Sequence, residues 1–334
     1  MGPSPAVAEV RNAVREALDD LDAGELVLAA CSGGADSLAL AAALAFVAPR
    51  AGLQAGGVTV DHGLQEGSAQ RAATVAALMS RLGLDPAHSV TVTPAKGNEA
   101  AARAARYEAL DQKAREQHAT TILLGHTLDD QAETVLLGLA RGSGSRSLAG
   151  MPARRGLYRR PLLGLRRATT AAACAELGLD PWQDPHNHDF RFTRVRVRHQ
   201  LMPVLEEALG PGVAEALART AGQLRADAEC LDDLAFAESG QLRGDCSDPA
   251  GLDARYLKDL PAAIRTRVLR DAAIMAGCPP GALTARHVER IEDLVTGWRG
   301  QRWVDLPGGV RARRQDGKVW FTSTEAGNSR GGEE

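Results

Sequence analysis

The sequence has little that marks secreted, membrane or cysteine-rich proteins. Its 334 residues include five cysteines, and no two of them form a CxxC pair. Their odd number and wide spacing argue against a disulfide framework, a zinc site and an iron–sulfur site. No apolar run approaches the ~20 residues of a membrane span. Residues 1–14 lack the basic segment and apolar core of a secretory signal, so we expect a cytoplasmic protein with no membrane partner.

Acidic residues are missing from one long stretch of the chain. The formal net charge is −3, yet residues 141–170 contain eight arginines and no Asp or Glu. A local basic stripe on a mildly acidic chain indicates a phosphate-rich partner on one face, and an ordinary solvated charged surface is the alternative. The arginines that we predict to bind this partner are Arg141, Arg146, Arg154, Arg155, Arg159, Arg160, Arg166 and Arg167.

The most informative motif lacks the lysine of a Walker A loop. The segment Ser-Gly-Gly-Ala-Asp-Ser at 32–37 lies between an apolar run at 25–31, which predicts a buried strand, and an Ala/Leu-rich stretch at 38–47, which predicts a helix. Such a strand–turn–helix directs backbone N–H groups at an anion, and Ser37 is placed to cap the helix. An ordinary glycine turn is the alternative interpretation. The predicted phosphate-binding residues are Ser32, Gly33, Gly34, Ala35, Asp36 and Ser37.

Asp36 narrows the kind of phosphate site. A carboxylate beside phosphates is repulsive unless a hard cation such as Mg²⁺ lies between them. We therefore predict that Asp36 is a Mg²⁺ ligand as well as part of the loop.

The first half of the chain alternates apolar strands with Ala-rich helices. Repeated βα units predict an α/β fold with a doubly wound parallel sheet and right-handed crossovers. Ligands of such sheets bind beyond the carboxyl ends of the strands, so the segments after the strands should line one crevice. The predicted strands are 53–60, 89–93 and 120–124, and the predicted helices are 67–82, 99–117 and 129–139.

The pattern changes near Pro203 to helix after helix, followed by a hairpin at 301–313. We therefore predict a catalytic domain at 1–204, a smaller and mainly helical substrate-binding domain at 205–325, and a disordered tail at 326–334. The expected helices are 204–209, 213–232, 262–275 and 285–294.

Acidic residues cluster after the fourth predicted strand. Asp129, Asp130 and Glu133 are spaced to share one face of a helix, and His126 precedes them. Acids in a first turn also favour the helix dipole, which is the simpler explanation. Next to a phosphate crevice, these four residues are candidate catalytic groups. They are suited to coordinate metal, to bind a cationic substrate group or to take a proton from an amine.

Several longer motifs resemble one family. The chain is similar, over roughly residues 25–205, to the tRNA(Ile)-lysidine synthases of the N-type ATP pyrophosphatase (PP-loop) superfamily. The motifs, in the family's order, are SGGADS (32–37), VDHGLQ (60–65), GNEAAARAARYEAL (97–110), GHTLDDQAETVLLGLARGSG (125–144), RRPLL (159–163) and RVRVRHQLMP (194–203).

The resemblance implies a fold, a reaction and a set of substrates. The fold is adenine-nucleotide alpha-hydrolase-like. The reaction activates the wobble cytidine of tRNA(Ile) with a CAU anticodon, using ATP and Mg²⁺, and free L-lysine then displaces AMP. The chain resembles the shorter form, which lacks the extra C-terminal domain of longer members.

The resemblance also implies residue roles. Asp61 and His62 would contact adenosine, and Arg106, with Arg103 beside it, would neutralise phosphate charge. The lysine site would be formed by Asp130, Glu133, Arg194 and Arg198, with His126 as a proton acceptor. The spacing leaves open which acid binds metal and which binds lysine. It also leaves open which arginine meets the lysine carboxylate.

Three other functions remain open from the sequence. One is another PP-loop ATP pyrophosphatase, such as a tRNA thiolase. A second is a small-molecule amidating synthetase. The third, of a different class, is a non-catalytic nucleotide-dependent RNA-binding protein. The oligomeric state is also open, a homodimer included.

Overall fold

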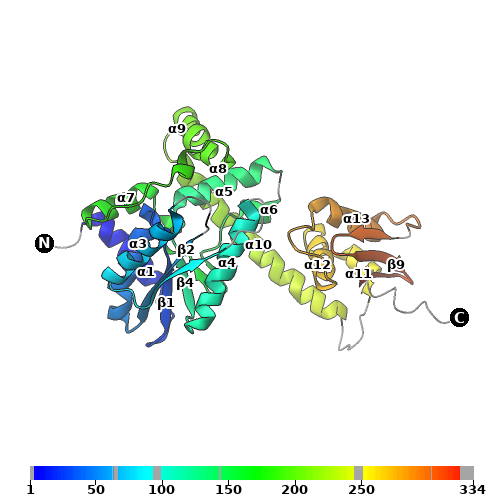
Figure 1. Cartoon of the computed structure of the whole chain (residues 1–334). Coiled ribbons are helices and arrows are strands. Elements are labelled where there is room, and N and C mark those ends of the chain that lie inside the picture. Colours follow the sequence, from blue (N-terminus) through cyan, green and yellow to red (C-terminus); the bar gives the residue numbers. More distant parts are fainter. Residues whose placement is uncertain are drawn as a thin grey trace. The chain divides into compact units, whose positions relative to one another are not determined.

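A computed structural model of the chain describes residues 4–61, 63, 67–92, 99–142, 144–243, 251–301 and 303–323 (Figure 1). The chain folds into two compact units, Met1–Arg141 with Leu148–Gly222, and Gly142–Ser147 with Gln223–Glu334. The division falls inside one long helix, α10 (Val213–Arg243). The domain limits predicted from sequence, 1–204 and 205–325, were placed where the sequence pattern changes, and they stay predictions. The predicted disordered tail at 326–334 lies outside the described residues.

The first unit is built on a six-stranded sheet of order β3-β2-β1-β4-β6-β5. All its pairings are parallel except the one between β5 and β6. The predicted doubly wound parallel sheet is therefore confirmed. Its strands are β1 (Leu26–Ala30), β2 (Gln54–Asp61), β3 (Ala87–Thr91), β4 (Thr121–Leu124), β5 (Arg154–Arg155) and β6 (Tyr158–Arg159).

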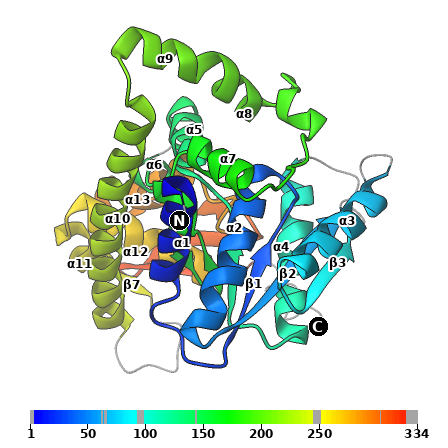
Figure 2. The ribbon, with the colours of Figure 1, turned by 90° about the vertical axis from the view of Figure 1, so that its left-hand side faces the viewer.

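Helices cover both faces of this sheet, because alternate residues of its strands are apolar on both sides. Val27 and Ala29 of β1 belong to a core with α1, α2, α3 and α7, and α1, α2 and α7 lie together in Figure 2. Leu26 and Leu28 face the opposite side, where Leu110 of α4 packs. The helices of the first unit are α1 (Pro5–Ala17), α2 (Ala35–Val47), α3 (Ser68–Arg81), α4 (Glu99–Glu116), α5 (Leu128–Ala140), α7 (Arg167–Glu176), α8 (Thr193–Arg196) and α9 (Met202–Leu209), with short turns of helix η1 (Ala48–Ala51), η2 (Pro161–Gly164), η3 (Pro185–His188) and η4 (Val197–Leu201). The short helix α6 (Ser145–Leu148) belongs mostly to the second unit.

The order of the strands places the site. β1 lies between β2 and β4, so the connections from β1 and β4 leave the sheet beside each other and diverge. This is the topological switch point, where a crevice opens beyond the carboxyl ends of the strands. The loop at 32–37 follows β1, and Gly125–Thr127 follow β4, so both motifs lie at this point.

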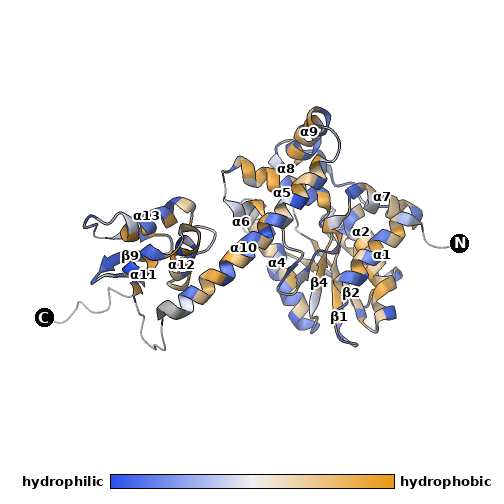
Figure 3. Cartoon of the chain, turned by 180° about the vertical axis from the view of Figure 1, so that it is seen from behind, coloured by the Kyte–Doolittle hydropathy of each residue, from blue (hydrophilic) through white to orange (hydrophobic). Residues whose placement is uncertain are grey.

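The elements predicted from sequence are present, with shifted ends. α2 begins at Ala35, inside the glycine motif, whereas the helix was predicted from residue 38. Eight of its thirteen residues are buried, and the apolar stretches of α1 and α2 appear in orange in Figure 3. α10 continues to Arg243 instead of ending at 232, because its sequence keeps the helical repeat of small and apolar residues. α1 and α7 were not predicted.

The second unit combines helices with a four-stranded antiparallel sheet of order β7-β10-β9-β8. The predicted hairpin is its β8–β9 pair, joined by a turn at Pro307–Gly309. Its core includes Leu257, Leu269 and Ile291, which are fully buried. The elements are β7 (Leu252–Asp253), α11 (Ala254–Asp259), α12 (Ala262–Met275), α13 (Ala285–Thr296), β8 (Val304–Leu306), β9 (Val310–Gln315) and β10 (Lys318–Ser323).

The described helices were also compared with the dimensions of a bilayer. Within the ranges given above, none of them is long and apolar enough to cross a membrane.

Candidate functional site

A pocket of about 770 Å³ opens at the switch point of the first unit. It is lined by the glycine loop, the end of β2, the helix α4 and the segment after β4, as the strand-end rule predicts. Of the residues predicted from sequence, those lining it are Ser32, Gly34, Ala35, Asp36, Ser37, Asp61, Arg103, Arg106, His126, Asp130, Arg167 and Arg198. His62 lies outside the described residues.

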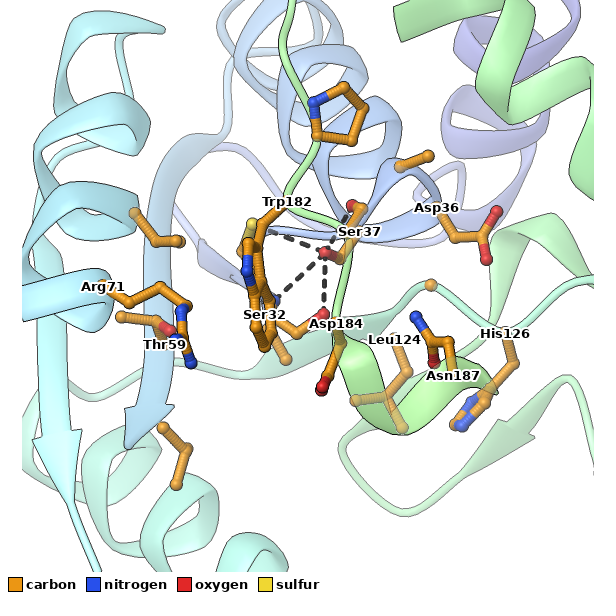
Figure 4. A pocket seen from close by; sticks show the side chains of 18 of the residues that line it. Ser32, Asp36, Ser37, Thr59, Arg71, Leu124, His126, Trp182, Asp184 and Asn187 are labelled. Carbon is orange, nitrogen blue, oxygen red and sulfur yellow. Dashed lines mark hydrogen bonds between the residues drawn. The ribbon is translucent and has the colours of Figure 1, made fainter. Parts of the chain in front are cut away.

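The glycine loop is shaped by its own hydrogen bonds. Gly33 has φ +87°, and a Cβ at this position would lie 2.8 Å from Cγ2 of Val75, so only glycine fits. The Ser37 hydroxyl accepts from the Ser32 backbone N–H at 3.1 Å and donates to the Gly34 carbonyl at 2.9 Å. Figure 4 shows these bonds at the centre of the pocket.

The start of α2 is open to a ligand. The N-cap of α2 is Gly34, and no side chain caps this helix, so the prediction that Ser37 caps it is wrong. The reason is that the helix begins three residues earlier than predicted, which places Ser37 inside the first turn. The first N–H groups of a helix carry the positive end of its dipole. At the edge of this pocket, that geometry suits a phosphate.

Asp36 lies between the loop and α7. Its carboxylate contacts the Thr170 hydroxyl, and one oxygen lies 3.5 Å from Nε of Arg167. Burial raises the pKa of Asp36, and Thr170 and Arg167 offset part of this rise. Among the residues that the structure describes, no group of three or more His, Cys, Asp or Glu side chains is placed to hold a metal ion. A single carboxylate beside a phosphate site still fits Mg²⁺, which commonly takes one or two carboxylates plus substrate phosphates.

The acids of α5 are fixed by the start of that helix. Thr127 is the N-cap, and its backbone N–H and hydroxyl donate to Oδ2 of Asp130 at 2.9 and 3.0 Å. The other oxygen, Oδ1, accepts from Arg167 at 2.8 Å and from Arg198 at 3.2 Å. Burial alone would raise the pKa of Asp130, but Arg167 and the Thr127 N–H hold it below the usual value. Asp129 instead accepts from the backbone N–H of Arg167 at 2.7 Å, so it binds the first turn of α7.

Arginines from two other segments complete this cluster. Nε of Arg198 donates to Glu133 at 2.7 Å, and its NH2 reaches the second oxygen of Glu133 at 3.1 Å. Arg167 donates to Asp130 at 2.8 Å and to Glu133 at 3.4 Å, and Arg194 lies 3.9 Å from Glu133. The Glu133 side chain is only 2% exposed. These ion pairs bring together acids predicted to bind lysine and arginines predicted to bind its carboxylate.

His126 is neutral at pH 7. Burial lowers its pKa to about 4, although Asp130 opposes the shift. Its Nδ1 is buried and has no hydrogen-bond partner among the described residues. An unpartnered ring nitrogen in a pocket is suited to contact a ligand.

The predicted arginine stripe divides into three kinds of residue. Arg167 lies in the pocket, as described above. Arg159 and Arg160 are buried, Arg159 against Asp20 and Arg160 against the Pro152 carbonyl at 2.9 Å. These two side chains are therefore not on the surface, contrary to the stripe prediction, because Arg159 lies in the buried strand β6 and Arg160 directly follows it. The remaining side chains of the stripe reach the surface, with Arg141, Arg146, Arg154 and Arg155 exposed and Arg166 half-buried. Arg154 pairs with Asp19 and Asp20, Arg146 with Asp232, and Arg166 with Asp129 and Glu215.

The sequence reasoning missed one wall of the pocket. The Trp182 backbone N–H donates to the Gly33 carbonyl at 2.9 Å, so this segment lies against the glycine loop. The Arg71 guanidinium stacks on the Trp182 ring, 3.8 Å from its centroid, as Figure 4 shows. Asp184 and Asn187 also line the pocket. The sequence offered one signal, because Trp182 is the only tryptophan before residue 298.

Comparison with known proteins agrees with this geometry. Residues 7–205 match the family described as PP-loop domain, and residues 252–320 match the TilS substrate binding domain. A tRNA(Ile)-lysidine synthase of Thermobifida fusca is 62% identical over 321 residues, covering 95% of this chain and 98% of that protein. Another, of Streptomyces coelicolor, is 53% identical, with coverages of 96% and 99%. The chain belongs to the tRNA(Ile)-lysidine synthase family.

Membership of the tRNA(Ile)-lysidine synthase family makes the chain an ATP-using ligase that modifies tRNA. A solved structure shares the fold at greater distance. It is the U34-tRNA thiolase NcsA from Methanococcus maripaludis with its [4Fe-4S] cluster, at a TM-score of 0.54 and 19% identity, covering 66% of this chain and 79% of that one. At this identity the likeness concerns the fold alone.

Proposed function

We propose that this protein joins free L-lysine to C2 of the wobble cytidine of tRNA(Ile) with a CAU anticodon. The cytosine O2 attacks the α-phosphate of ATP and pyrophosphate leaves. The side-chain amine of lysine, having lost a proton, then forms a bond to C2, and the C2–O bond breaks to release AMP. The observation that carries this proposal is one pocket that joins the glycine loop to the Asp130–Arg198 cluster.

The glycine loop is suited to the first step. Backbone N–H groups at the start of α2 would hold the departing pyrophosphate, and Asp36 would hold Mg²⁺, which offsets phosphate charge when bound. Arg106 lines the pocket from α4, where a guanidinium stabilises charge that develops on the transferring phosphate. Asp61, 5% exposed, accepts from the Gly63 N–H at 2.9 Å and so fixes the turn at the adenosine side.

The carboxylates of α5 are suited to the second step. Asp130 and Glu133 would bind the lysine ammonium, and Arg198, whose fork matches a carboxylate, would orient the amino acid. The neutral imidazole of His126 would accept the proton that the amine loses. The contact of Asp129 with α7 supports a positioning role for this residue.

For tRNA, we propose contacts by the exposed arginines of the stripe. Arg155 is a suitable test residue because its side chain is exposed and lies outside the pocket. Replacing it with alanine should weaken tRNA binding and reduce the slope of log K against log salt concentration by about one. Pyrophosphate release at saturating tRNA should stay at the parent rate.

The cysteines near the loop support this reaction over thiolation. Burial raises the pKa of Cys31, and it raises that of Cys174 to about 11, so neither thiol supplies thiolate at pH 7. A non-catalytic RNA-binding protein would not need the charged cluster around Glu133. Neither alternative is favoured.

The deciding experiment follows the lysine. The protein is incubated with ATP, Mg²⁺, labelled lysine and a tRNA(Ile) transcript with a CAU anticodon, and lysine in the RNA, AMP and pyrophosphate are measured. The matched control is the same transcript with uridine at the wobble position. Label in the first RNA alone is the expected result, and its absence from both would refute the function.

The metal role has a test of its own. Asp36→Asn should reduce pyrophosphate release by at least about a hundredfold, as loss of a charge-stabilising group in a transition state does. Near-parental turnover by this variant would exclude Asp36 as the metal ligand.

A further inference from the structure

The Arg167 guanidinium stands where an amine would bind. Its NH2 lies 2.8 Å from Oδ1 of Asp130 and 3.4 Å from Oε1 of Glu133, and its Nε lies 3.5 Å from Oδ2 of Asp36. A lysine ammonium held by Asp130 and Glu133 needs the same point between their two oxygens. Arg167 and that ammonium therefore exclude each other.

The two acids that would hold the ammonium already have guanidinium partners. Asp130 contacts Arg167 and Arg198, and Glu133 contacts Arg167, Arg194 and Arg198. These guanidinium groups compensate both carboxylates without any ligand. An ammonium gains a favourable site only when one guanidinium leaves.

Arg167 is the guanidinium best placed to leave. Arg198 holds Glu133 through both carboxylate oxygens, at 2.7 and 3.1 Å. Arg167 makes one close contact, with Asp130, and longer ones with the other acids. It also reaches Asp36, on the side where the phosphates of ATP would bind, so an anion there offers the guanidinium another partner.

We propose that Arg167 closes the amine site in the nucleotide-free protein, and that bound ATP opens it by drawing the guanidinium toward the phosphates. Lysine binding then depends on ATP binding, and the two affinities are coupled through one side chain. This inference rests on the proposed function, because it concerns the amine site of that reaction.

The test measures lysine affinity in a cycle of protein and nucleotide. Equilibrium dialysis with labelled lysine compares the parent and Arg167→Gln, each without nucleotide and with α,β-methylene-ATP and Mg²⁺. We expect the analogue to lower the Kd of the parent for lysine about tenfold. This factor applies when the site is open in about a tenth of the nucleotide-free molecules. Arg167→Gln should bind lysine about tenfold tighter than the parent without nucleotide, and the analogue should add nothing.

Two further variants separate this role from a structural one. Arg167→Lys keeps the charge, and its affinity for lysine without nucleotide should return toward that of the parent. A structural role of Arg167 would instead weaken lysine binding in both Arg167→Gln and Arg167→Lys. Arg191→Gln removes one arginine that pairs with Asp189, outside the pocket, and should leave lysine affinity unchanged.

Equal or weaker lysine binding by Arg167→Gln overturns the inference, as does coupling that survives in this variant. If Arg167→Gln does not fold, the parent decides, because a lysine affinity that ignores the analogue overturns it equally. Transfer of lysine to tRNA by the parent is measured separately. Its loss would refute the proposed function, whereas intact transfer without coupling refutes this inference alone.

Discussion

Replacing Glu133 with glutamine should measurably destabilise the first unit. The Glu133 side chain is 2% exposed, and its oxygens lie 2.7 and 3.1 Å from nitrogens of Arg198. Removing one partner of a buried ion pair costs about 3–5 kcal/mol, because the remaining charge stays buried without compensation. Glutamine keeps the size and one acceptor oxygen, and Asp130 still faces Arg198. We therefore expect a loss at the lower end, about 3 kcal/mol.

At about 2–4 °C per kcal/mol for a domain of this size, the Tm should fall by about 6–12 °C. The assay is thermal unfolding by circular dichroism, read on the transition that ATP shifts to higher temperature. The double variant Glu133→Gln/Arg198→Gln should lose less stability than the two single changes together, by at least about 1 kcal/mol, because it removes both charges. A Tm within about 2 °C of the parent would refute the reasoning, as would additive losses in the cycle.

Three other outcomes follow from particular residues. Gly33→Ala should destabilise by at least about 1–2 kcal/mol, the cost of a left-handed non-glycine residue, and should raise the KM for ATP. Gly24→Ala is the matched control, because Gly24 also has positive φ, +89°, but lies outside the pocket, so the KM for ATP should not change. Trp182 is the one tryptophan of the first unit, since the others are at 298, 303 and 320. ATP should therefore quench a component of tryptophan fluorescence that the Trp182→Phe variant lacks. If ATP changes the fluorescence of that variant as it does that of the parent, the place of Trp182 in the pocket is contradicted. Burial lowers the pKa of His126 from 6.5 to about 4, so its contribution to stability is complete above about pH 6.5 and is lost as the pH falls through about 4. The Tm should decline over this window more in the parent than in His126→Asn. Parallel profiles of Tm against pH would contradict the lowered pKa.

Much of the fold and part of the site were predictable from local pattern. A strand followed by glycines and a helix start predicts where backbone N–H groups point, and alternation of strands and helices predicts a parallel sheet. The rule for strand ends then brings Ser32–Ser37, Asp61 and His126 to one pocket, as the structure has them. Trp182 was missed because it lies in an irregular segment, which a backbone hydrogen bond to Gly33 holds against the loop.

The sequence by itself determined the chemistry that this protein offers: a glycine loop without lysine, an acid within it, a carboxylate-rich helix start and an arginine-rich stretch. These features depend on residue type and on spacing over a few positions, which secondary structure converts directly into geometry. Only the tertiary structure decided how the charges pair. Arg159 and Arg160 are buried, while Arg167 enters the pocket and joins Asp36 to Asp130 and Glu133. Ion pairs between residues more than thirty positions apart depend on how β6, α7 and α5 pack, and no local pattern contains that information.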